Sequence, residues 1–250
     1  MASLTDNELR AVAYYSIGVS SEGGDVAYKL SYAGRIIHEN DGSVMLDPAG
    51  GSNSGYSIGT LQTDFGAHPK DARALVDSFQ DWAKTHHPDW ILSAQQQANF
   101  ALDLGRDGNH IRDPNFDADK KTYHGKKNIP SDHMPKSGQD IDQTFKAKLN
   151  DYLTTNAGIS FIHQRDTSQV DKLMESVVPI LKSTDLYKNS DPQDQAKIFA
   201  IVGKAYNQSD DLGQDILKDV SHQKINSLEG INEPPREVGR LFGLSHAALA

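Results

Sequence analysis

Gly55-Tyr56-Ser57-Ile58-Gly59-Thr60-Leu61-Gln62-Thr63-Asp64-Phe65-Gly66 is a stretch in which three glycines are spaced among apolar and polar residues. Glycine lets the backbone turn tightly and lets a ligand approach the main chain closely. Between its apolar residues the stretch offers a hydroxyl, an amide and a carboxylate group, from Ser57, Gln62 and Asp64. The pattern therefore predicts a small hairpin that forms the wall of a polar cleft.

A helix is predicted upstream of this stretch, over about residues 5–20. Its start, Thr5-Asp6-Asn7-Glu8, has the Thr-x-x-Glu form of a capping box. The last turn delivers Glu22 next to Gly23-Gly24, where the chain can leave the helix with the carboxylate facing a cleft. The apolar residues at helical spacing are Leu9, Val12, Ala13 and Ile17.

Together, these two segments resemble the lysozyme-like superfamily of peptidoglycan hydrolases, which includes phage endolysins, goose-type lysozymes and soluble lytic transglycosylases. In that superfamily a catalytic Glu lies at the end of the first helix, and a β-hairpin follows. Glu22 matches the first element. The stretch 55–59 matches the Gly-x-Thr/Ser-Ile-Gly pattern of phage lysozymes, and Gly59-Thr60-Leu61-Gln62 matches the Gly-x-x-Gln pattern of transglycosylases. The resemblance covers about residues 5–66.

The resemblance implies a division of roles between the helix end and the hairpin. Glu22 is the expected general acid that protonates the departing glycosidic oxygen. This role requires a carboxyl group that is still protonated near neutral pH, which partial burial favours. Ser57 stands where the phage enzymes use Thr, and its hydroxyl is expected to hold the attacking water. An inverting mechanism needs roughly 6.5–9.5 Å between the groups on the two faces of the sugar.

The second carboxylate is an open choice at this point. Phage lysozymes place an Asp a few residues before the hairpin Gly, where this chain has Ser52 and Asn53. Asp47 and Asp64 are the candidates for the base, although an Asp in a Gly-rich turn commonly caps a neighbouring amide. If neither reaches the site, Ser57 and Gln62 could position the water, or the sugar's own hydroxyl could attack, as in transglycosylases.

Gln62, Tyr56 and Thr60 are the predicted substrate-binding residues. An amide can bridge sugar hydroxyls and N-acetyl groups, and an aromatic ring can stack on a pyranose face. The alternatives are that the Gln62 amide bonds to the hairpin backbone and that the Tyr56 ring packs against the core. Packing is the favoured interpretation for Tyr56.

The fold class predicted is mainly helical, of the α+β lysozyme-like kind, with a small β-hairpin lobe forming a cleft. A length of 250 residues with 37% hydrophobic content fits a single domain over residues 1–250. Within it, residues 5–66 hold the catalytic helix end and hairpin, and residues 67–250 form a helical body. A long loop is predicted at about 105–140, where apolar periodicity is weak. Helices are predicted from Pro69, over 93–104, 141–156, 167–182, 191–206 and 210–221.

Composition and motifs argue against several other classes. The chain has no cysteine, which excludes thiol catalysis, and its net charge of -9 opposes nonspecific binding to nucleic acid. No His-Glu-x-x-His, Gly-x-Ser-x-Gly or nucleotide-binding glycine pattern occurs. We therefore expect no metal, no other cofactor, no nucleic-acid partner and no integral membrane segment.

The function predicted from the resemblance is that of a muramidase, which hydrolyses the β-1,4 bond between N-acetylmuramic acid and N-acetylglucosamine. A lytic transglycosylase that gives anhydro-muramic products, a non-catalytic wall-binding or virion module, and a chitinase-type enzyme are the alternatives. The N-terminus lacks the basic and apolar regions of a signal peptide. The expectation is a monomer made in the cytoplasm that acts on the periplasmic or cell-wall side. It would arrive as a phage endolysin released by a holin, or as an antibacterial effector with a cognate immunity protein.

Overall fold

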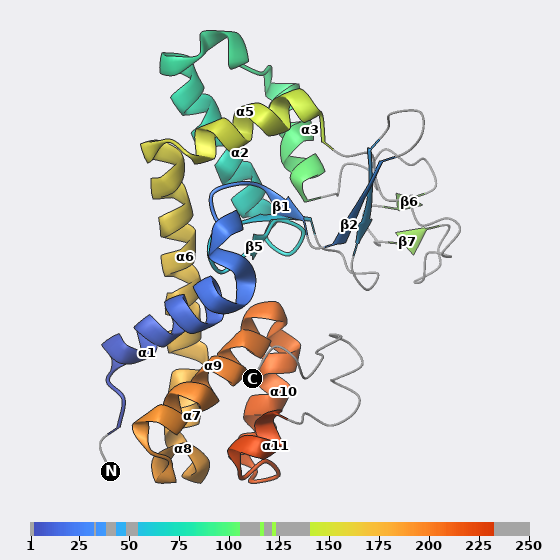
Figure 1. Ribbon diagram of the computed structural model, residues 1–250. Helices are drawn as coiled ribbons and strands as arrows, with labels where there is room; N and C mark the ends of the chain where they lie inside the picture. The colour runs from blue at the N-terminus through green and yellow to red at the C-terminus, as the bar shows by residue number, and fades with distance from the viewer. Residues whose placement is uncertain are drawn as a thin grey trace. The chain divides into compact units, whose positions relative to one another are not determined.

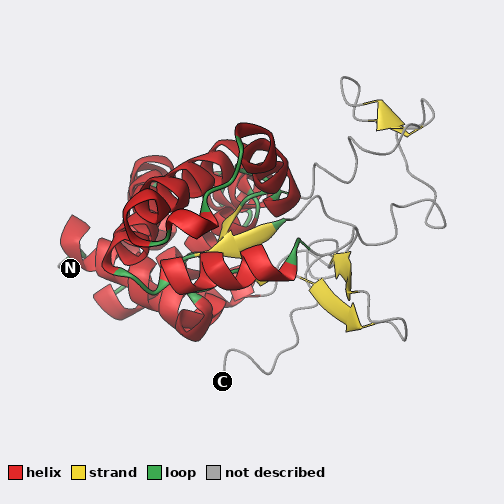
Figure 2. Ribbon diagram, turned by 90° about the horizontal axis from the view of Figure 1, so that it is seen from above, coloured by secondary structure: helices red, strands yellow, loops and turns green. Residues whose placement is uncertain are grey.

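The computed structural model shows a mainly helical protein with a small antiparallel sheet, which confirms the mainly helical fold class (Figure 2). The chain divides into two compact units, one formed by Met1–Gly24 with Arg165–Ala250 and the other by Asp25–Gln164. That these units constitute a single domain stays a prediction. The structure describes residues 3–32, 34–38, 44–48, 55–105, 116–117, 122–123 and 141–232.

The α-helices of the described residues are labelled in Figure 1, and three further helical segments are named η1, η2 and η4. Their bounds are α1 (Asp6–Val12), η1 (Ala13–Gly23), η2 (Gly24–Val26), α2 (Pro69–His86), η4 (Pro88–Trp90), α3 (Ala94–Leu104), α5 (Gln143–Leu153), α6 (Asn156–Ser176), α7 (Val178–Ser183), α8 (Asp185–Asn189), α9 (Pro192–Gln208), α10 (Asp210–Ser221) and α11 (Leu228–Asn232).

Within the residues that the structure describes, the strands form three antiparallel groups. One is a sheet in the order β1-β4-β5, and the other two are the pairs β2-β3 and β6-β7. Most of the loop predicted at 105–140 lies outside the described residues. The strand bounds are β1 (Ser31–Tyr32), β2 (Gly34–His38), β3 (Val44–Pro48), β4 (Tyr56–Ile58), β5 (Thr63–Asp64), β6 (Phe116–Asp117) and β7 (Thr122–Tyr123).

The first helix begins at the predicted capping box. The Thr5 hydroxyl accepts a hydrogen bond from the backbone N–H of Glu8 at 3.3 Å, and the Glu8 carboxylate accepts one from the backbone N–H of Thr5 at 2.8 Å. The Thr5 N–H holds the pKa of Glu8 below its usual value. After Val12 the helix continues as the π-helix η1 to Gly23, so Glu22 lies inside the helical segment. Long π-helices are rare, and short ones are frequent at functional sites.

In the unit that contains both η1 and α9, the packing centres on α9. Helices α1, α10, α11 and η1 all contact α9. A Cβ atom at Gly203 of α9 would lie 2.6 Å from the Cδ1 atom of Ile17 in η1, and one at Gly213 of α10 would lie 2.4 Å from the Cα atom of Tyr206. Glycine at these positions therefore lets the helices approach closely.

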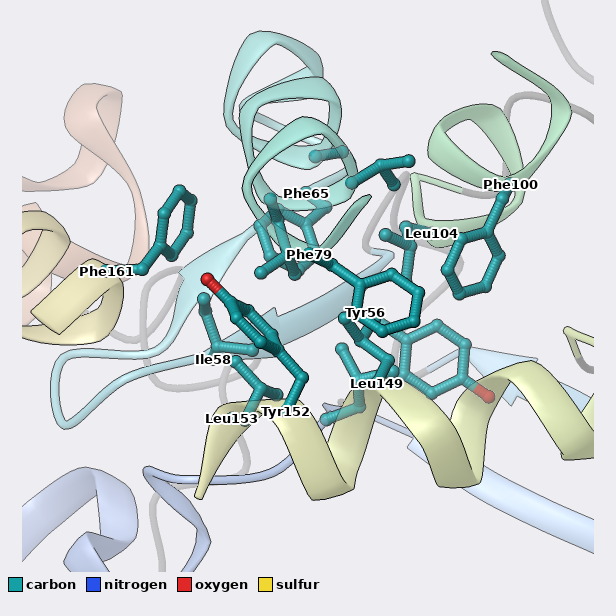
Figure 3. Close-up of a cluster of buried hydrophobic side chains, with 14 of the residues drawn as sticks. Tyr56, Ile58, Phe65, Phe79, Phe100, Leu104, Leu149, Tyr152, Leu153 and Phe161 are labelled. Carbon is teal, nitrogen blue, oxygen red and sulfur yellow. The ribbon is translucent and has the colours of Figure 1, made fainter. Parts of the chain in front are cut away.

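In the unit of residues 25–164, one face of the β1-β4-β5 sheet packs against helices. Figure 3 shows side chains from the β4–β5 hairpin, α2, α3, α5 and the start of α6 meeting in one cluster. The buried Tyr152 hydroxyl bonds to Ser78 at 2.7 Å, and burial raises the pKa of Tyr152 despite this bond. The members of the cluster shown include Tyr56, Ile58, Phe65, Phe79, Phe100, Leu104, Leu149, Tyr152, Leu153 and Phe161.

Most predicted helices are confirmed, but the one predicted at 167–182 is wrong in its bounds. Helix α6 begins already at Asn156 and ends at Ser176, and α7 follows. Gly158 does not separate helices: a Cβ atom there would lie 2.2 Å from the Tyr152 carbonyl oxygen, so glycine permits a close approach to the end of α5. Pro179, near the start of α7, lacks the N–H group that would continue α6.

The ion pair of Asp6 with Lys182 gives a testable pH dependence. The carboxylate and ammonium groups are 2.7 Å apart, and hydrogen bonding to Lys182 lowers the pKa of Asp6 from 3.8. We expect Lys182→Met to raise this pKa towards 3.8, measured by NMR titration of the Asp6 carboxyl carbon. A lowered folded-state pKa means that the pair stabilises the fold above the unfolded pKa, and that this contribution disappears as pH falls through the folded pKa.

The control for this titration is Lys197→Met, which removes an ammonium group that pairs with Asp194 instead. It should leave the Asp6 titration unchanged. An Asp6 pKa that did not move in Lys182→Met would contradict the pairing.

Candidate functional site

The β1-β4-β5 sheet has two chemically different faces. Tyr56 and Ile58 of β4 are fully buried in the core, whereas Ser57 between them points to the other face, because successive side chains of a strand alternate. The same alternation sets Ser31 of β1 apart from Leu30, which belongs to the core cluster. The outer face is therefore the polar one.

Strand register aligns three polar side chains across this outer face. Ser31 is paired with Ser57, and Ser57 is paired with Asp64. Residues directly opposite each other in antiparallel strands carry their side chains on the same face. We call Ser31, Ser57 and Asp64 the polar row. Sequence reasoning missed Ser31, because it lies 26 residues before Ser57 and only strand pairing brings the two together.

Gln62 joins two members of the polar row in one hydrogen-bond network. Its Oε1 atom accepts hydrogen bonds from the hydroxyls of Ser31 at 2.5 Å and Ser57 at 2.8 Å. The two hydroxyl oxygens are 2.9 Å apart. The Gln62 Nε2 group donates to the Gly59 carbonyl at 2.8 Å, which matches the predicted alternative of an amide bonded to the hairpin backbone. We call Ser31, Ser57 and Gln62 the serine–glutamine network.

The turn between β4 and β5 holds Gln62 in place. Gly59 has φ 86° and Gln62 has φ 54°, both in the left-handed region that favours glycine. The Gln62 N–H donates to the Gly59 carbonyl at 3.2 Å, and the Gly59 N–H donates to the carbonyl of Ala27 at 2.9 Å. A left-handed non-glycine residue carries a backbone cost, which the bonds of the Gln62 side chain offset.

Asp64 supports the hairpin through one carboxylate oxygen. Its Oδ1 atom accepts hydrogen bonds from the backbone N–H groups of Gly55 at 2.9 Å and Gly66 at 2.7 Å, with a longer one from Ala67 at 3.4 Å. This is the turn-capping behaviour that was the alternative to a catalytic role. Its other oxygen, Oδ2, accepts no hydrogen bond from residues that the structure describes.

Replacing Asp64 tests this capping role. We expect Asp64→Ala to lower the free energy of unfolding by about 1–3 kcal/mol, because it leaves two close backbone N–H groups without their charged acceptor. Asp64→Asn keeps an oxygen acceptor, so its decrease in the free energy of unfolding should be less than half of that for Asp64→Ala. Urea unfolding, followed by the fluorescence of Trp82 and Trp90, measures both. If Asp64→Ala and Asp64→Asn lowered the free energy of unfolding equally, the capping role of Asp64 would be contradicted.

Tyr56 lies in the core rather than on a surface that a glycan could reach. Its side chain has 0% exposure, its ring lies 5.5 Å from that of Tyr32, and its hydroxyl is 3.1 Å from the Lys146 ammonium group. This packing is the interpretation favoured from sequence, and a role of Tyr56 in substrate binding stays a prediction. Thr60 is also buried, with 3% exposure. Its role in substrate binding stays a prediction.

Two predicted catalytic residues have side chains outside the described part of the structure. The backbone of Glu22 belongs to η1, and that of Asp47 belongs to β3, where it is paired with Arg35. Their catalytic roles stay predictions. Ala27, whose carbonyl accepts the hydrogen bond from the Gly59 turn, is five positions after Glu22 in the chain.

No protein-family model, curated protein or solved structure matches this chain. The lysozyme-like assignment consequently depends on the residues of the helix end and the hairpin. Among the side chains that the structure describes, no group of three or more His, Asp or Glu residues is arranged to hold a metal ion. No helix within the described ranges combines the length and the apolar character needed to cross a membrane.

Proposed function

We propose that this protein is a peptidoglycan glycosidase with a lysozyme-like fold, which cleaves the β-1,4 bond between N-acetylmuramic acid and N-acetylglucosamine. The observation that carries the proposal is the polar row with Gln62, held on the outer face of a hairpin whose sequence pattern resembles that of phage lysozymes. Such a row offers neutral hydroxyls beside a carboxylate. These are the groups that bind a water molecule and sugar hydroxyls.

The chain connection supports a partnership between Glu22 and the hairpin. Ala27 is hydrogen-bonded to Gly59, and five residues at about 3.6 Å each keep the Cα atom of Glu22 within about 18 Å of that of Ala27. The role of the Glu22 carboxyl group as the general acid comes from the resemblance to phage lysozymes. The position of its side chain is part of the proposal.

In the proposed reaction, Glu22 gives its proton to the glycosidic oxygen as the bond from that oxygen to the anomeric carbon breaks. A water molecule held by Ser57 forms the new bond to the anomeric carbon and gives up one proton to a carboxylate. Asp64 is the first candidate for this base, because its Oδ2 atom is on the same sheet face as Ser57 and is not used to cap the turn. Asp47 is the second candidate. Both carboxylates would regain their starting protonation through solvent.

One observation favours a second candidate function, that of a lytic transglycosylase. The Oδ1 atom of Asp64 is engaged by backbone N–H groups, which restrains the carboxylate in its capping geometry. If that geometry keeps Asp64 from the water, the sugar's own hydroxyl is the nucleophile and the product is an anhydro-muramic sugar. The Gly59-to-Gln62 segment, which resembles the transglycosylase pattern, fits this alternative.

In either case the biological role proposed is lysis of bacterial cells. The protein would reach the wall as a phage endolysin or as a delivered antibacterial effector. An effector of this kind requires an immunity protein in the cell that makes it, and the outer face of the sheet is the surface that such an inhibitor would cover.

Digestion of purified peptidoglycan, followed by mass spectrometry of the released muropeptides, tests the proposal. Reducing-end disaccharides are the expected products of hydrolysis, and anhydro products would assign the protein to the transglycosylases. Chitin oligomers in a parallel digestion test for the chitinase alternative. If no glycan bond is broken but the protein sediments with peptidoglycan, the enzyme proposal fails and a wall-binding module takes its place.

A further inference from the structure

We propose that Ser31 is a positioning residue that orients the Ser57 hydroxyl towards the attacking water through the serine–glutamine network. The inference rests on the proposed glycosidase function. It concerns a residue that the lysozyme-like sequence patterns do not include. Its basis is a count of the hydrogen atoms available to the network.

The orientation of the Gln62 amide is fixed by the backbone. Because Nε2 donates to the Gly59 carbonyl at 2.8 Å, the Oε1 atom is the one that faces the two serines. A rotated amide would bring its oxygen against the Gly59 carbonyl oxygen, which is repulsive. Oε1 has two lone pairs and no hydrogen, so it can only accept.

Three close oxygen pairs in this network share two hydroxyl hydrogens. The pairs are Ser31–Gln62 at 2.5 Å, Ser57–Gln62 at 2.8 Å and Ser31–Ser57 at 2.9 Å. When both hydroxyls donate to Gln62, no hydrogen lies between the two serine oxygens. The alternative acceptor for Ser31, the carbonyl of Ser57, is longer at 3.3 Å. The network therefore leaves lone pairs on the serine oxygens that can accept a hydrogen from outside.

This arrangement makes Ser57 an acceptor for an incoming O–H group. Its own hydrogen is directed at Gln62, so its lone pairs are free to accept a hydrogen from water. Ser31 restrains this acceptor, because its hydroxyl donates to the same Gln62 Oε1 atom that receives the Ser57 hydrogen, and its oxygen lies 2.9 Å from the Ser57 oxygen. Ser57 is 6% exposed, and Ser31 and Gln62 are half-buried at its side, so few solvent molecules compete for the position.

The test compares Ser31→Ala with Ser31→Thr, which restores a hydroxyl on a residue that suits a strand. Loss of one neutral hydrogen bond corresponds to about a five- to tenfold effect. We expect Ser31→Ala to lower kcat on soluble muropeptide chains by about this factor with KM within about twofold, and Ser31→Thr to recover most of the rate. The control is Ser160→Ala, an exposed serine of α6 in the same unit.

A second readout needs no substrate. The NMR signals of the Gln62 side-chain amide report hydrogen bonding at Oε1, and they should shift in Ser31→Ala and remain near the wild-type position in Ser31→Thr and Ser160→Ala. Equal kcat values for wild type and Ser31→Ala would overturn the inference and leave the glycosidase proposal intact. A rate loss that threonine does not restore, with unshifted Gln62 signals, would also overturn it. If wild-type protein cleaved no glycan, the glycosidase proposal itself would be overturned. The role of Ser31, which rests on it, would then be overturned as well.

Discussion

Glu22→Gln is expected to reduce the rate of glycan cleavage by about 10²- to 10⁴-fold, the range that a positioned general acid contributes. Glutamine keeps the size and polarity of the side chain but has no proton to give to the glycosidic oxygen. The measurement is the initial rate of muropeptide release from purified peptidoglycan. Because Glu22 lies in a helical segment, where glutamine and glutamate are equally well accommodated, the thermal midpoint should stay close to that of wild type.

The matched control is Glu175→Gln, the same chemical change at an exposed position of α6. It should release muropeptides at the wild-type rate. If Glu22→Gln were as active as this control while wild type cleaves glycan, the general acid would have to be another residue. Asp64→Asn and Asp47→Asn would then be assayed in the same way.

Phe79→Ala is expected to lower the free energy of unfolding of the unit that contains it by about 3–5 kcal/mol. Phe79 has 0% exposure, and its ring lies 5.6 Å from that of Tyr152 and 6.4 Å from that of Trp90. Truncation removes the transfer free energy of the ring and leaves a cavity between α2 and α5. Urea unfolding monitored by tryptophan fluorescence suits this test, because the chain has two tryptophans, Trp82 and Trp90, and both lie in this unit.

Ile91→Ala is the control for Phe79→Ala, since Ile91 is 42% exposed and follows directly after η4. Exposed positions of this kind usually change stability by less than about 0.5 kcal/mol. If Phe79→Ala and Ile91→Ala lowered the free energy of unfolding by similar amounts, the aromatic cluster of this unit would not govern its stability. Circular dichroism reports the helices of both units, and its comparison with tryptophan fluorescence recognises a loss confined to this unit.

Local chemistry allowed several elements to be predicted from sequence. The capping box at Thr5 and the Asp191-Pro192 start of α9 depend on bonds within one turn, and both are present in the structure. The apolar spacing from Ala72 to Phe79 predicted α2 because one face of a helix repeats every three to four residues. In these segments the information that fixes the backbone lies within a few residues of the position that it fixes.

Gly158 shows where local rules fail. As a lone glycine it is typical of a break between helices, yet it lies in the first turn of α6 because only glycine fits against the end of α5. The same holds for Gln62. Its sequence position predicted a polar hairpin group, but the left-handed backbone and the bonds to two serines follow from the turn and from strand pairing.

The sequence by itself determined the helical character of the chain, the capped start of its first helix and the alternation of apolar and polar residues in the hairpin. Each of these follows from spacing within a segment. Tertiary structure alone decided that Ser31 faces Ser57, that one oxygen of Asp64 binds the N–H groups of both Gly55 and Gly66, and that Gln62 bonds to two serines. Those outcomes depend on which strands pair and which face meets the core. Pairing joins residues far apart in the chain, so no local pattern encodes it.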